Sequence, residues 1–407
     1  MAKKGEKPGA RASGRRGDAR AGSAPRESAP QEAPLPQRAP LLQEAPPPEP
    51  GAARPEAAPG EDERDAALRP RRLSEFLGQK AMKGNLLVFI RAALERGESL
   101  DHLFLIGPPG LGKTTLARVA ANELEAGFSQ TSAPALDKPK DLVGLLTNLK
   151  KGDVFFIDEI HRLKPAIEEL LYIAMEDYEL DWIVGQGPMA RTLRIPIQPF
   201  TLVGATTKAG AVSGPLISRF GITCRFSFYE QEDMEAIVRR SAGLLGVGIC
   251  ADAAALLAKS SRGTPRVANR LLRRMRDFAQ GSAQGSSAQG EARPSGRPSG
   301  LGAAITLGAV REGLGRLEID SLGLERQDRD ILRMIAERYR GGPVGAETLA
   351  ISVGESVETL EDYYEPFLIQ AGLLQRTPRG RMLTALAYGH LGLGPPEGAG
   401  NGGGFLF

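Results

Sequence analysis

The chain has few of the residues that mark metal-binding, secreted or membrane proteins. Its 407 residues include two cysteines and three histidines, and no apolar run approaches the roughly 18 residues of a membrane span. Cys224 and Cys250 lack metal-ligand spacing and are too few for a disulfide framework, so both are expected to be reduced thiols in or near the core. The start lacks the apolar segment of a secretory signal, and the chain is therefore expected to be cytoplasmic, with no membrane partner.

Three segments have too few apolar side chains to pack into a domain. Residues 1–65 hold 12 of the 30 prolines and almost no aliphatic residues, which predicts a disordered arm. Residues 281–300 are rich in glycine and serine and are predicted to be a flexible insertion. Residues 393–407 are a glycine-rich tail. The composition of these segments does not indicate a role for any of them.

Between these segments the apolar pattern predicts three folded domains. Strand-like and amphipathic stretches alternate from 66 to 228, which is typical of an α/β domain with a parallel sheet and helices on both faces. Helical patterns alone follow at 229–325, and residues 326–392 combine helices with a strand, a turn and a strand, as in a winged helix. The predicted strands are 103–106, 154–157 and 200–206, and the predicted helices are 115–124, 166–175, 231–244, 251–260, 265–280, 307–316, 328–340, 346–353 and 356–371.

The segment Gly107–Thr114, Gly-Pro-Pro-Gly-Leu-Gly-Lys-Thr, predicts a loop that binds nucleotide phosphates. Its glycines, including Gly110, let backbone N–H groups face the ligand, Lys113 can reach the β/γ-phosphates, and the Thr114 hydroxyl can ligate Mg²⁺. The alternative is an ordinary glycine-rich turn. We favour the phosphate loop because the strand before it and the helix after it are the context that this motif needs.

Two carboxylates, Asp158 and Glu159, follow the predicted strand at 154–157. The C-terminal ends of parallel strands are where ligands bind. Asp158 is therefore predicted to be an outer-sphere partner of Mg²⁺, and Glu159 the base that polarises an attacking water. A solvated acidic turn is the alternative. The pair favours hydrolysis of ATP over transfer to an acceptor, with ATP and Mg²⁺ as the cofactors.

Two arginines and a threonine stay ambiguous on spacing alone. Arg219 follows the third predicted strand, and Arg266 lies at the start of a basic helix. A guanidinium can stabilise charge on phosphoryl oxygens, and one supplied by a neighbouring subunit would make hydrolysis depend on assembly. Thr206, or Thr207 beside it, could hold the attacking water. Each residue could equally be an ordinary surface, capping or strand-end residue.

Taken together, these residues resemble those of the RuvB family of AAA+ ATPases, the bacterial Holliday-junction branch-migration motor. The resemblance covers about 300 residues and is carried by strings far more specific than a bare phosphate loop. Besides Leu68-Arg69-Pro70, these strings are Leu73–Gln79, Asp101–Thr115, Ile157–Leu163, Ala174–Tyr178, Gly204–Thr207, Arg219–Gly221, Gly263–Arg266, Ala268–Arg274, Gly341–Gly345 and Gln375–Arg381. The long arm, the insertion and the tail depart from the family pattern.

The resemblance implies a fold, an activity and a set of site residues. The fold would be an α/β P-loop AAA+ domain, an all-α lid and a C-terminal winged helix. The activity would be ATP-driven pumping of duplex DNA through Holliday junctions in recombination, DNA repair and the SOS response, by a homohexamer working with a RuvA-like junction-binding protein and a RuvC-like resolvase. Thr206 resembles sensor 1, Arg219 the arginine finger that acts in trans, and Arg266 sensor 2. The implied nucleotide contacts are Leu68, Arg69, Gly110, Lys113, Thr114, Thr115, Glu176, Asp177, Tyr178, Arg219, Tyr229 and Arg266.

Basic side chains in the predicted wing are the candidate DNA contacts, because the net charge of +3 is too small to indicate nucleic acid by itself. The third helix of the winged helix is acidic and would be repelled by phosphates. Arg376, Arg379 and Arg381 lie in or beside the turn instead and are suited to backbone phosphates, with little capacity to read bases. Arg376 and Arg381 are the predicted DNA contacts. A solvated basic turn is the alternative.

Residues 178–199 resemble a hairpin inserted before the strand at 200–206. The single tryptophan, Trp182, is expected to be exposed near the tip, beside Gly185 and Gly187. The family resemblance makes this hairpin the docking site for the RuvA-like partner. A core tryptophan is the alternative.

Two other functions fit part of this pattern. A clamp-loader-like switch would use nucleotide to open a partner, but the basic wing and the extent of the resemblance argue against it. A winged-helix regulator that does not hydrolyse ATP would have no use for Glu159 and Arg219. The sequence does not indicate the oligomeric state of the free protein or the direction and rate of translocation.

Overall fold

The structure is a computed structural model that describes residues 67–184, 191–287 and 302–394. The predicted arm at 1–65, most of the insertion at 281–300 and nearly all of the tail lie outside the described residues. No helix among the described residues is both long and apolar enough to cross a membrane.

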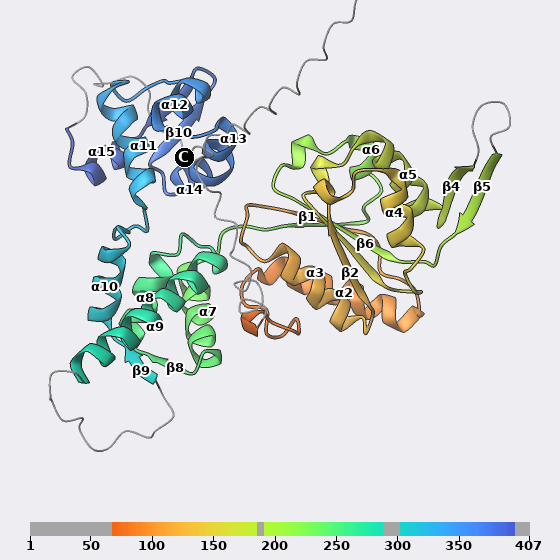
Figure 1. Cartoon of the computed structure of the whole chain (residues 1–407), viewed down its shortest axis with the longest axis horizontal. Coiled ribbons are helices and arrows are strands. Elements are labelled where there is room, and N and C mark those ends of the chain that lie inside the picture. The colour runs from red at the N-terminus through yellow and green to blue at the C-terminus, as the bar shows by residue number, and fades with distance from the viewer. Residues whose placement is uncertain (1–66, 185–190, 288–301, 395–407) are drawn as a thin grey trace, which may run out of the picture. The chain divides into compact units, whose positions relative to one another are not determined.

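A five-stranded parallel sheet with the order β2-β3-β6-β1-β7 forms the centre of the first domain (Figure 1). The predicted strands are confirmed within a residue, whereas two further strands were not predicted from the sequence. The strands are β1 (Leu103–Ile106), β2 (Phe128–Ser132), β3 (Val154–Asp158), β6 (Thr201–Thr206) and β7 (Ile222–Arg225). A parallel sheet needs a covering layer on each face.

The helices of this domain cover both faces of the sheet, and alternating strand residues pack against each layer. Phe156 belongs to the cluster that contains Leu86 and Leu116, whereas Phe155 belongs to the cluster that contains Leu142 and Leu171. The helices are α2 (Lys80–Arg96), α3 (Lys113–Glu123), α4 (Pro139–Leu146), α5 (Pro165–Glu176) and α6 (Gly214–Ile217), with 3-10 turns η1 (Ala133–Ala135), η2 (Ile160–Arg162) and η4 (Ala209–Ala211). The prediction of an α/β domain is confirmed.

An antiparallel hairpin, β4 (Glu179–Val184) and β5 (Arg191–Pro196), projects before β6 (Figure 1). Trp182 is half-buried and pairs with Leu193, which is 55% exposed. The hairpin is confirmed, but Trp182 lies within the strand rather than at its tip, and it is not a core residue. Gly185 and Gly187 lie outside the described residues.

The second domain consists of helices and one short strand pair. It contains α7 (Gln231–Leu244), β8 (Val247–Ile249), α8 (Ala251–Lys259), α9 (Pro265–Ser287), β9 (Gly302–Ile305) and α10 (Leu307–Arg316). β8 and β9 pair in parallel, so the expectation of helices alone was incomplete. Helix α9 continues to Ser287, seven residues into the predicted insertion. Cys224 is buried but Cys250 is exposed, because it caps α8 from outside the helix; the expectation for Cys250 was wrong.

The third domain is a winged helix, as predicted. Helices α11 (Arg326–Glu337) and α12 (Ala346–Val353) precede a third helical stretch that is divided into α13 (Val357–Thr359), a π-helical segment η5 (Leu360–Tyr364) and α14 (Glu365–Gln370). The wing is the antiparallel pair β10 (Leu374–Thr377) and β11 (Gly380–Leu383), and α15 (Ala385–Leu391) follows it. These elements enclose their own apolar cluster, which includes Leu332, Leu349 and Leu368.

Candidate active site

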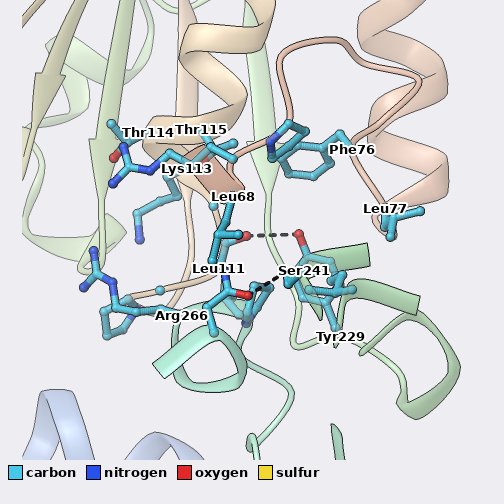
Figure 2. Close-up of a pocket in the computed structure, with 18 of the residues that line it drawn as sticks. Leu68, Phe76, Leu77, Leu111, Lys113, Thr114, Thr115, Tyr229, Ser241 and Arg266 are labelled. Atoms are coloured by element: carbon cyan, nitrogen blue, oxygen red, sulfur yellow. Dashed lines mark hydrogen bonds between the residues drawn. The ribbon is translucent and has the colours of Figure 1, made fainter. Parts of the chain in front are cut away.

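A pocket forms where the phosphate loop meets the start of the described chain and two helices of the second domain. Its predicted members are Leu68, Arg69, Gly110, Lys113, Thr114, Thr115, Asp158, Glu159, Tyr229 and Arg266. Figure 2 shows Lys113, Thr114 and Arg266 toward one end of this pocket, and Leu77 and Tyr229 toward the other. The arrangement suits a ligand with an anionic end and an apolar end.

Lys113 is the cation of the anionic end. It begins α3, and its ammonium donates hydrogen bonds to the carbonyl oxygens of Gly107 at 2.7 Å and Pro108 at 2.9 Å. Burial lowers the pKa of Lys113 to about 8, while the nearby carboxylates of Asp158 and Glu159 oppose that shift. The partly desolvated ammonium lies at the N-terminus of a helix, where backbone N–H groups also favour an anion.

The loop can approach the second domain closely because position 110 is glycine. Gly110 has a φ of +80°, and a Cβ there would lie 2.7 Å from Cγ2 of Thr264. The Arg266 backbone N–H lies 3.4 Å from the Gly110 carbonyl oxygen. Arg266, at the second position of α9, therefore reaches the phosphate end from the second domain.

The apolar end is closed by residues from three parts of the chain. Leu68, Phe76 and Tyr229 are all buried, and the Tyr229 hydroxyl donates to the Leu111 carbonyl oxygen at 3.1 Å. Arg240 of α7 donates to the Leu68 carbonyl oxygen at 2.8 Å, which holds the segment around Leu68 against the pocket. Such an apolar slot can accept a planar base.

Asp158 and Glu159 are both half-buried at the end of β3 and line the pocket as predicted. The Glu159 backbone has a φ of +51°, and its N–H donates to Asp158 Oδ1 at 3.0 Å. Glu159 Oε2 lies 3.3 Å from His161 Nδ1. Thr114 and Asp158 offer the oxygen donors that Mg²⁺ prefers. No cluster of three or more His, Cys, Asp or Glu that could hold a metal occurs among the residues described.

The sequence left open whether Thr206 or Thr207 offers its hydroxyl to the attacking water. Thr206 is fully buried, and its Oγ1 contacts His161 Nδ1 at 3.0 Å and accepts the Lys208 backbone N–H at 3.0 Å. Thr207, the next residue, lines the pocket instead. The sequence could not separate them, because β6 ends at Thr206 and the direction of the chain after the strand depends on the fold.

Four predicted nucleotide contacts do not line the pocket of their own chain. Glu176, Asp177 and Tyr178 follow one another at the end of α5, and Arg219 follows α6. Arg219 Nε lies 3.1 Å from Glu176 Oε1, and the guanidinium stacks over the Tyr172 ring at 4.5 Å. These residues form a cluster of their own, which we call the finger cluster (Tyr172, Glu176 and Arg219).

The two predicted DNA contacts differ in the structure. Arg376 is 57% exposed, whereas Arg381 is buried with its Nε 2.6 Å from Glu365 Oε1 and its Nη2 2.5 Å from Glu361 Oε1. Arg381 is therefore not free to meet a phosphate in this arrangement. Its carboxylate partners belong to the acidic third helix, so part of that negative charge is neutralised inside the domain.

Sequence reasoning missed several lining residues. Ile237 and Ser241 are four residues apart on α7, and Asn269 follows Arg266 by three positions on α9. These i, i+3 and i, i+4 spacings place each pair on one helix face. The spacing was visible in the sequence, but nothing indicated that those faces meet a ligand.

Comparisons with known proteins match this architecture domain by domain. Family models described as the Holliday junction DNA helicase RuvB P-loop domain, the RuvB AAA lid domain and the RuvB C-terminal winged helix domain match residues 68–226, 229–293 and 321–392. The Holliday junction branch migration complex subunit RuvB of Treponema denticola is 66% identical over 344 residues, which is 84% of this chain and 95% of that protein. The same subunit from Borreliella burgdorferi is 54% identical over 332 residues, 82% of this chain and 90% of that protein.

A solved structure agrees as well. The Thermotoga maritima RuvB Holliday junction branch migration motor superposes with a TM-score of 0.70 at 46% identity, covering 81% of this chain and 100% of the other.

Proposed function

Because the chain belongs to the RuvB family of AAA+ ATPases, we propose that it is an ATP hydrolase that drives branch migration of Holliday junctions. The observation that carries the proposal is the pocket, in which a lysine, a threonine and two carboxylates surround the place of the phosphates, while Arg266 reaches in from the lid. The superposition on the Thermotoga maritima RuvB motor, which covers 81% of this chain, supports the same proposal.

In this proposal Lys113 binds the β/γ-phosphates, and Glu159 takes a proton from the attacking water. Mg²⁺ would be held by the Thr114 hydroxyl, with Asp158 in its outer sphere, and would neutralise charge that develops on the phosphate oxygens. Thr207 replaces Thr206 as the hydroxyl offered to the water or the γ-phosphate. Arg266 acts as sensor 2, reporting the phosphate state to the lid.

The finger cluster acts on the nucleotide of an adjacent subunit. Arg219 and the segment Glu176-Asp177-Tyr178 are absent from the lining of their own pocket, as a trans-acting site requires. A homohexameric ring would place each cluster beside a neighbour's phosphates. The Arg219 guanidinium would exchange Glu176 for the γ-phosphate, so hydrolysis would depend on assembly.

The wing and the hairpin are the proposed contacts with DNA and the RuvA-like protein. Arg376 is exposed and contacts backbone phosphates, while Arg381 supports the wing and reaches DNA only if its carboxylate partners release it. The half-exposed Trp182 and exposed Leu193 of the β4–β5 hairpin offer apolar surface to the junction-binding protein. We further propose that the motor acts in the cytoplasm, in DNA recombination, repair and the SOS response, with a RuvC-like resolvase.

Turnover of ATP and dissociation of synthetic Holliday junctions, measured with and without a RuvA-like protein, test this function. We expect DNA to stimulate turnover and the partner to be needed for efficient junction dissociation. Turnover without dissociation would favour a clamp-loader-like switch, and DNA binding without turnover would favour a winged-helix regulator. Either result would contradict the motor proposal.

A further inference from the structure

His161 lies between the catalytic carboxylate and a buried threonine, and the function proposed above gives it no role. It belongs to the 3-10 turn η2 directly after β3 and is half-buried. Its Nδ1 lies 3.0 Å from Thr206 Oγ1 and 3.3 Å from Glu159 Oε2. Among residues 67–184, 191–287 and 302–394, His161 is the one hydrogen-bonding or ion-pairing partner found for the Glu159 carboxylate.

Thr206 is held in one position and fixes the imidazole ring of His161. It ends β6, is completely buried, and accepts the Lys208 backbone N–H at 3.0 Å. Its carbonyl oxygen accepts the N–H of Gly107, the first glycine of the phosphate loop, at 3.2 Å. A threonine held at both its backbone and its hydroxyl gives the ring a fixed partner.

The position of the ring proton follows from the two neighbours of Nδ1. Burial lowers the pKa of His161, while Glu159 opposes that shift, and the neutral ring carries one N–H. A carboxylate oxygen 3.3 Å from Nδ1 can only accept a hydrogen bond. The tautomer protonated at Nδ1 is therefore favoured: its N–H donates to Thr206 Oγ1 and its positive edge faces the carboxylate, whereas the other tautomer would set a nitrogen lone pair against Glu159.

We propose that His161 is a positioning residue for Glu159: Thr206 fixes the ring, whose Nδ1 edge faces Oε2 at 3.3 Å and attracts it, which leaves Oε1 to accept the proton of the attacking water. This inference rests on the hydrolase function proposed above. Glu159 lines the pocket and is partly exposed, so an unrestrained carboxylate would sample several rotamers. Fixing one oxygen removes that freedom before water arrives.

Two amide substitutions separate the role of Nδ1 from the presence of a polar side chain. In His161→Asn the amide nitrogen sits at the δ position and can donate to Glu159. In His161→Gln it sits at the ε position, one bond further out, where the ring has Nε2. We expect His161→Gln and His161→Ala to lower single-turnover hydrolysis by about 10- to 100-fold, the range for losing an outer hydrogen-bond partner of a functional group. His161→Asn should recover most of that loss, and Thr206→Val should lower the rate in the same direction as His161→Gln.

The Kd for ATP separates positioning of Glu159 from a general structural role, because structural damage to the pocket would weaken ATP binding as well. Kd for ATP should stay within about twofold of wild type in every variant, because His161 does not contact the pocket's phosphate loop directly. Lys164→Gln, an exposed position shortly after the same turn, is the matched control and should turn over normally. In a Glu159→Gln background, His161→Gln should add little further loss, since no carboxylate remains to position.

Equal turnover of His161→Gln and wild type would overturn the inference, as would a His161→Asn variant impaired as severely as His161→Gln. Weakened ATP binding in proportion to lost turnover would also overturn it, because that would indicate disruption of the pocket. Failure of the hydrolase function is distinguishable, since Glu159→Gln alone would then turn over ATP at the wild-type rate.

Discussion

The nucleotide pocket and the wing each bury a cation, and the two cations have different neighbours. Lys113 donates to the carbonyl oxygens of Gly107 and Pro108, and no carboxylate lies within ion-pair distance of its ammonium in the described ranges. Arg381 is sandwiched by two carboxylates, those of Glu361 and Glu365. Lys113 is thus only partly compensated and can gain from an incoming phosphate, whereas Arg381 is already neutralised.

This difference separates a binding cation from a structural one. A buried charge without an ionic partner loses hydration, and the pKa of Lys113 is lowered to about 8 by its burial. A ligand that supplies negative charge replaces the electrostatic stabilisation that the ammonium lost with its water. A buried ion pair, by contrast, opposes any exchange of partners, because removing one member leaves the other charge uncompensated. The sign of residue charge alone does not distinguish these two cases.

Removing Lys113 should have the largest effect. Lys113→Ala takes away the cation at the phosphate end, so we expect ATP binding to fall below detection and turnover with it. Glu159→Gln is the matched control, since it should bind ATP but hydrolyse it orders of magnitude more slowly. Equilibrium binding of a fluorescent ATP analogue checks both. Retained binding by Lys113→Ala would show that the loop backbone and Arg266 suffice.

Arg219 tests a third kind of cation, one paired with Glu176 at the surface of its own chain. Arg219→Ala should lower turnover by a factor on the order of 10³ while ATP binding survives. When mixed with wild-type protein, it should reduce activity by more than its mole fraction, because each variant subunit disables a neighbour. A strictly proportional decline across the mixing series would contradict both the trans-acting finger and the cooperative ring.

Arg381→Met should destabilise the winged helix rather than act mainly on DNA. The substitution removes the nearer of the two cations beside the buried Glu365 carboxylate and leaves only Arg376, at 4.0 Å, so the loss should approach the cost of breaking buried pairs, about 3–5 kcal/mol. The free energy of unfolding of the third domain measures this loss. It can be obtained from urea unfolding followed by hydrogen exchange of the α14 amides. The double variant Arg381→Met with Glu365→Leu should recover part of it. An Arg381→Met protein of wild-type stability that binds DNA poorly would return Arg381 to its predicted role as a phosphate contact.

Part of the fold of the first domain could be predicted from the sequence. Strands β1, β3 and β6 were predicted because continuous apolar runs precede the glycine loop, the carboxylates and the threonines. Helix α2 was not predicted, since its apolar residues do not keep to one face: Leu86 and Ile90 are buried while Val88 and Phe89 are exposed.

In the site, the phosphate loop and the carboxylates were predictable because their residue types and order suffice for the chemistry. The roles of Thr206, Thr207 and Arg381 were not. These depend on what the folded chain places around each side chain: the antiparallel register sets Arg376 opposite Arg381, both contact Glu361, and only Arg381 is buried there. Contacts between residues far apart in the sequence decide these surroundings, and a local sequence pattern does not contain that information.

The pH dependence of nucleotide binding tests the buried cation Lys113 through a smaller effect than the substitutions above. With a pKa of about 8 in the free protein, Lys113 loses its proton above that pH, and phosphate binding must then restore it. Apparent Kd for ATP should therefore rise by up to about tenfold per pH unit above 8. Unfolding would not explain the change: the lowered pKa means that the unfolded chain binds more protons between about 8 and 10.5, so Lys113's contribution to stability rises over that range. A flat profile from pH 7 to 9 would show that the ammonium keeps its proton in the free protein.

Arg376→Ala should have the smallest effect, and it tests whether an exposed cation of the wing behaves unlike the buried one. Arg376 is 57% exposed and lies 3.0 Å from Glu361 Oε1, a pair of the surface type that contributes little to stability. Unfolding free energy should change by less than about 1 kcal/mol. DNA affinity should fall to a similar extent for unrelated duplex sequences, and the slope of log K against log salt should decrease by about 1, because one phosphate contact releases its counterions. Arg379→Ala is the comparison variant on the same turn. A loss confined to particular sequences would mean that the wing reads bases, and an unchanged salt slope would mean that Arg376 does not touch the backbone.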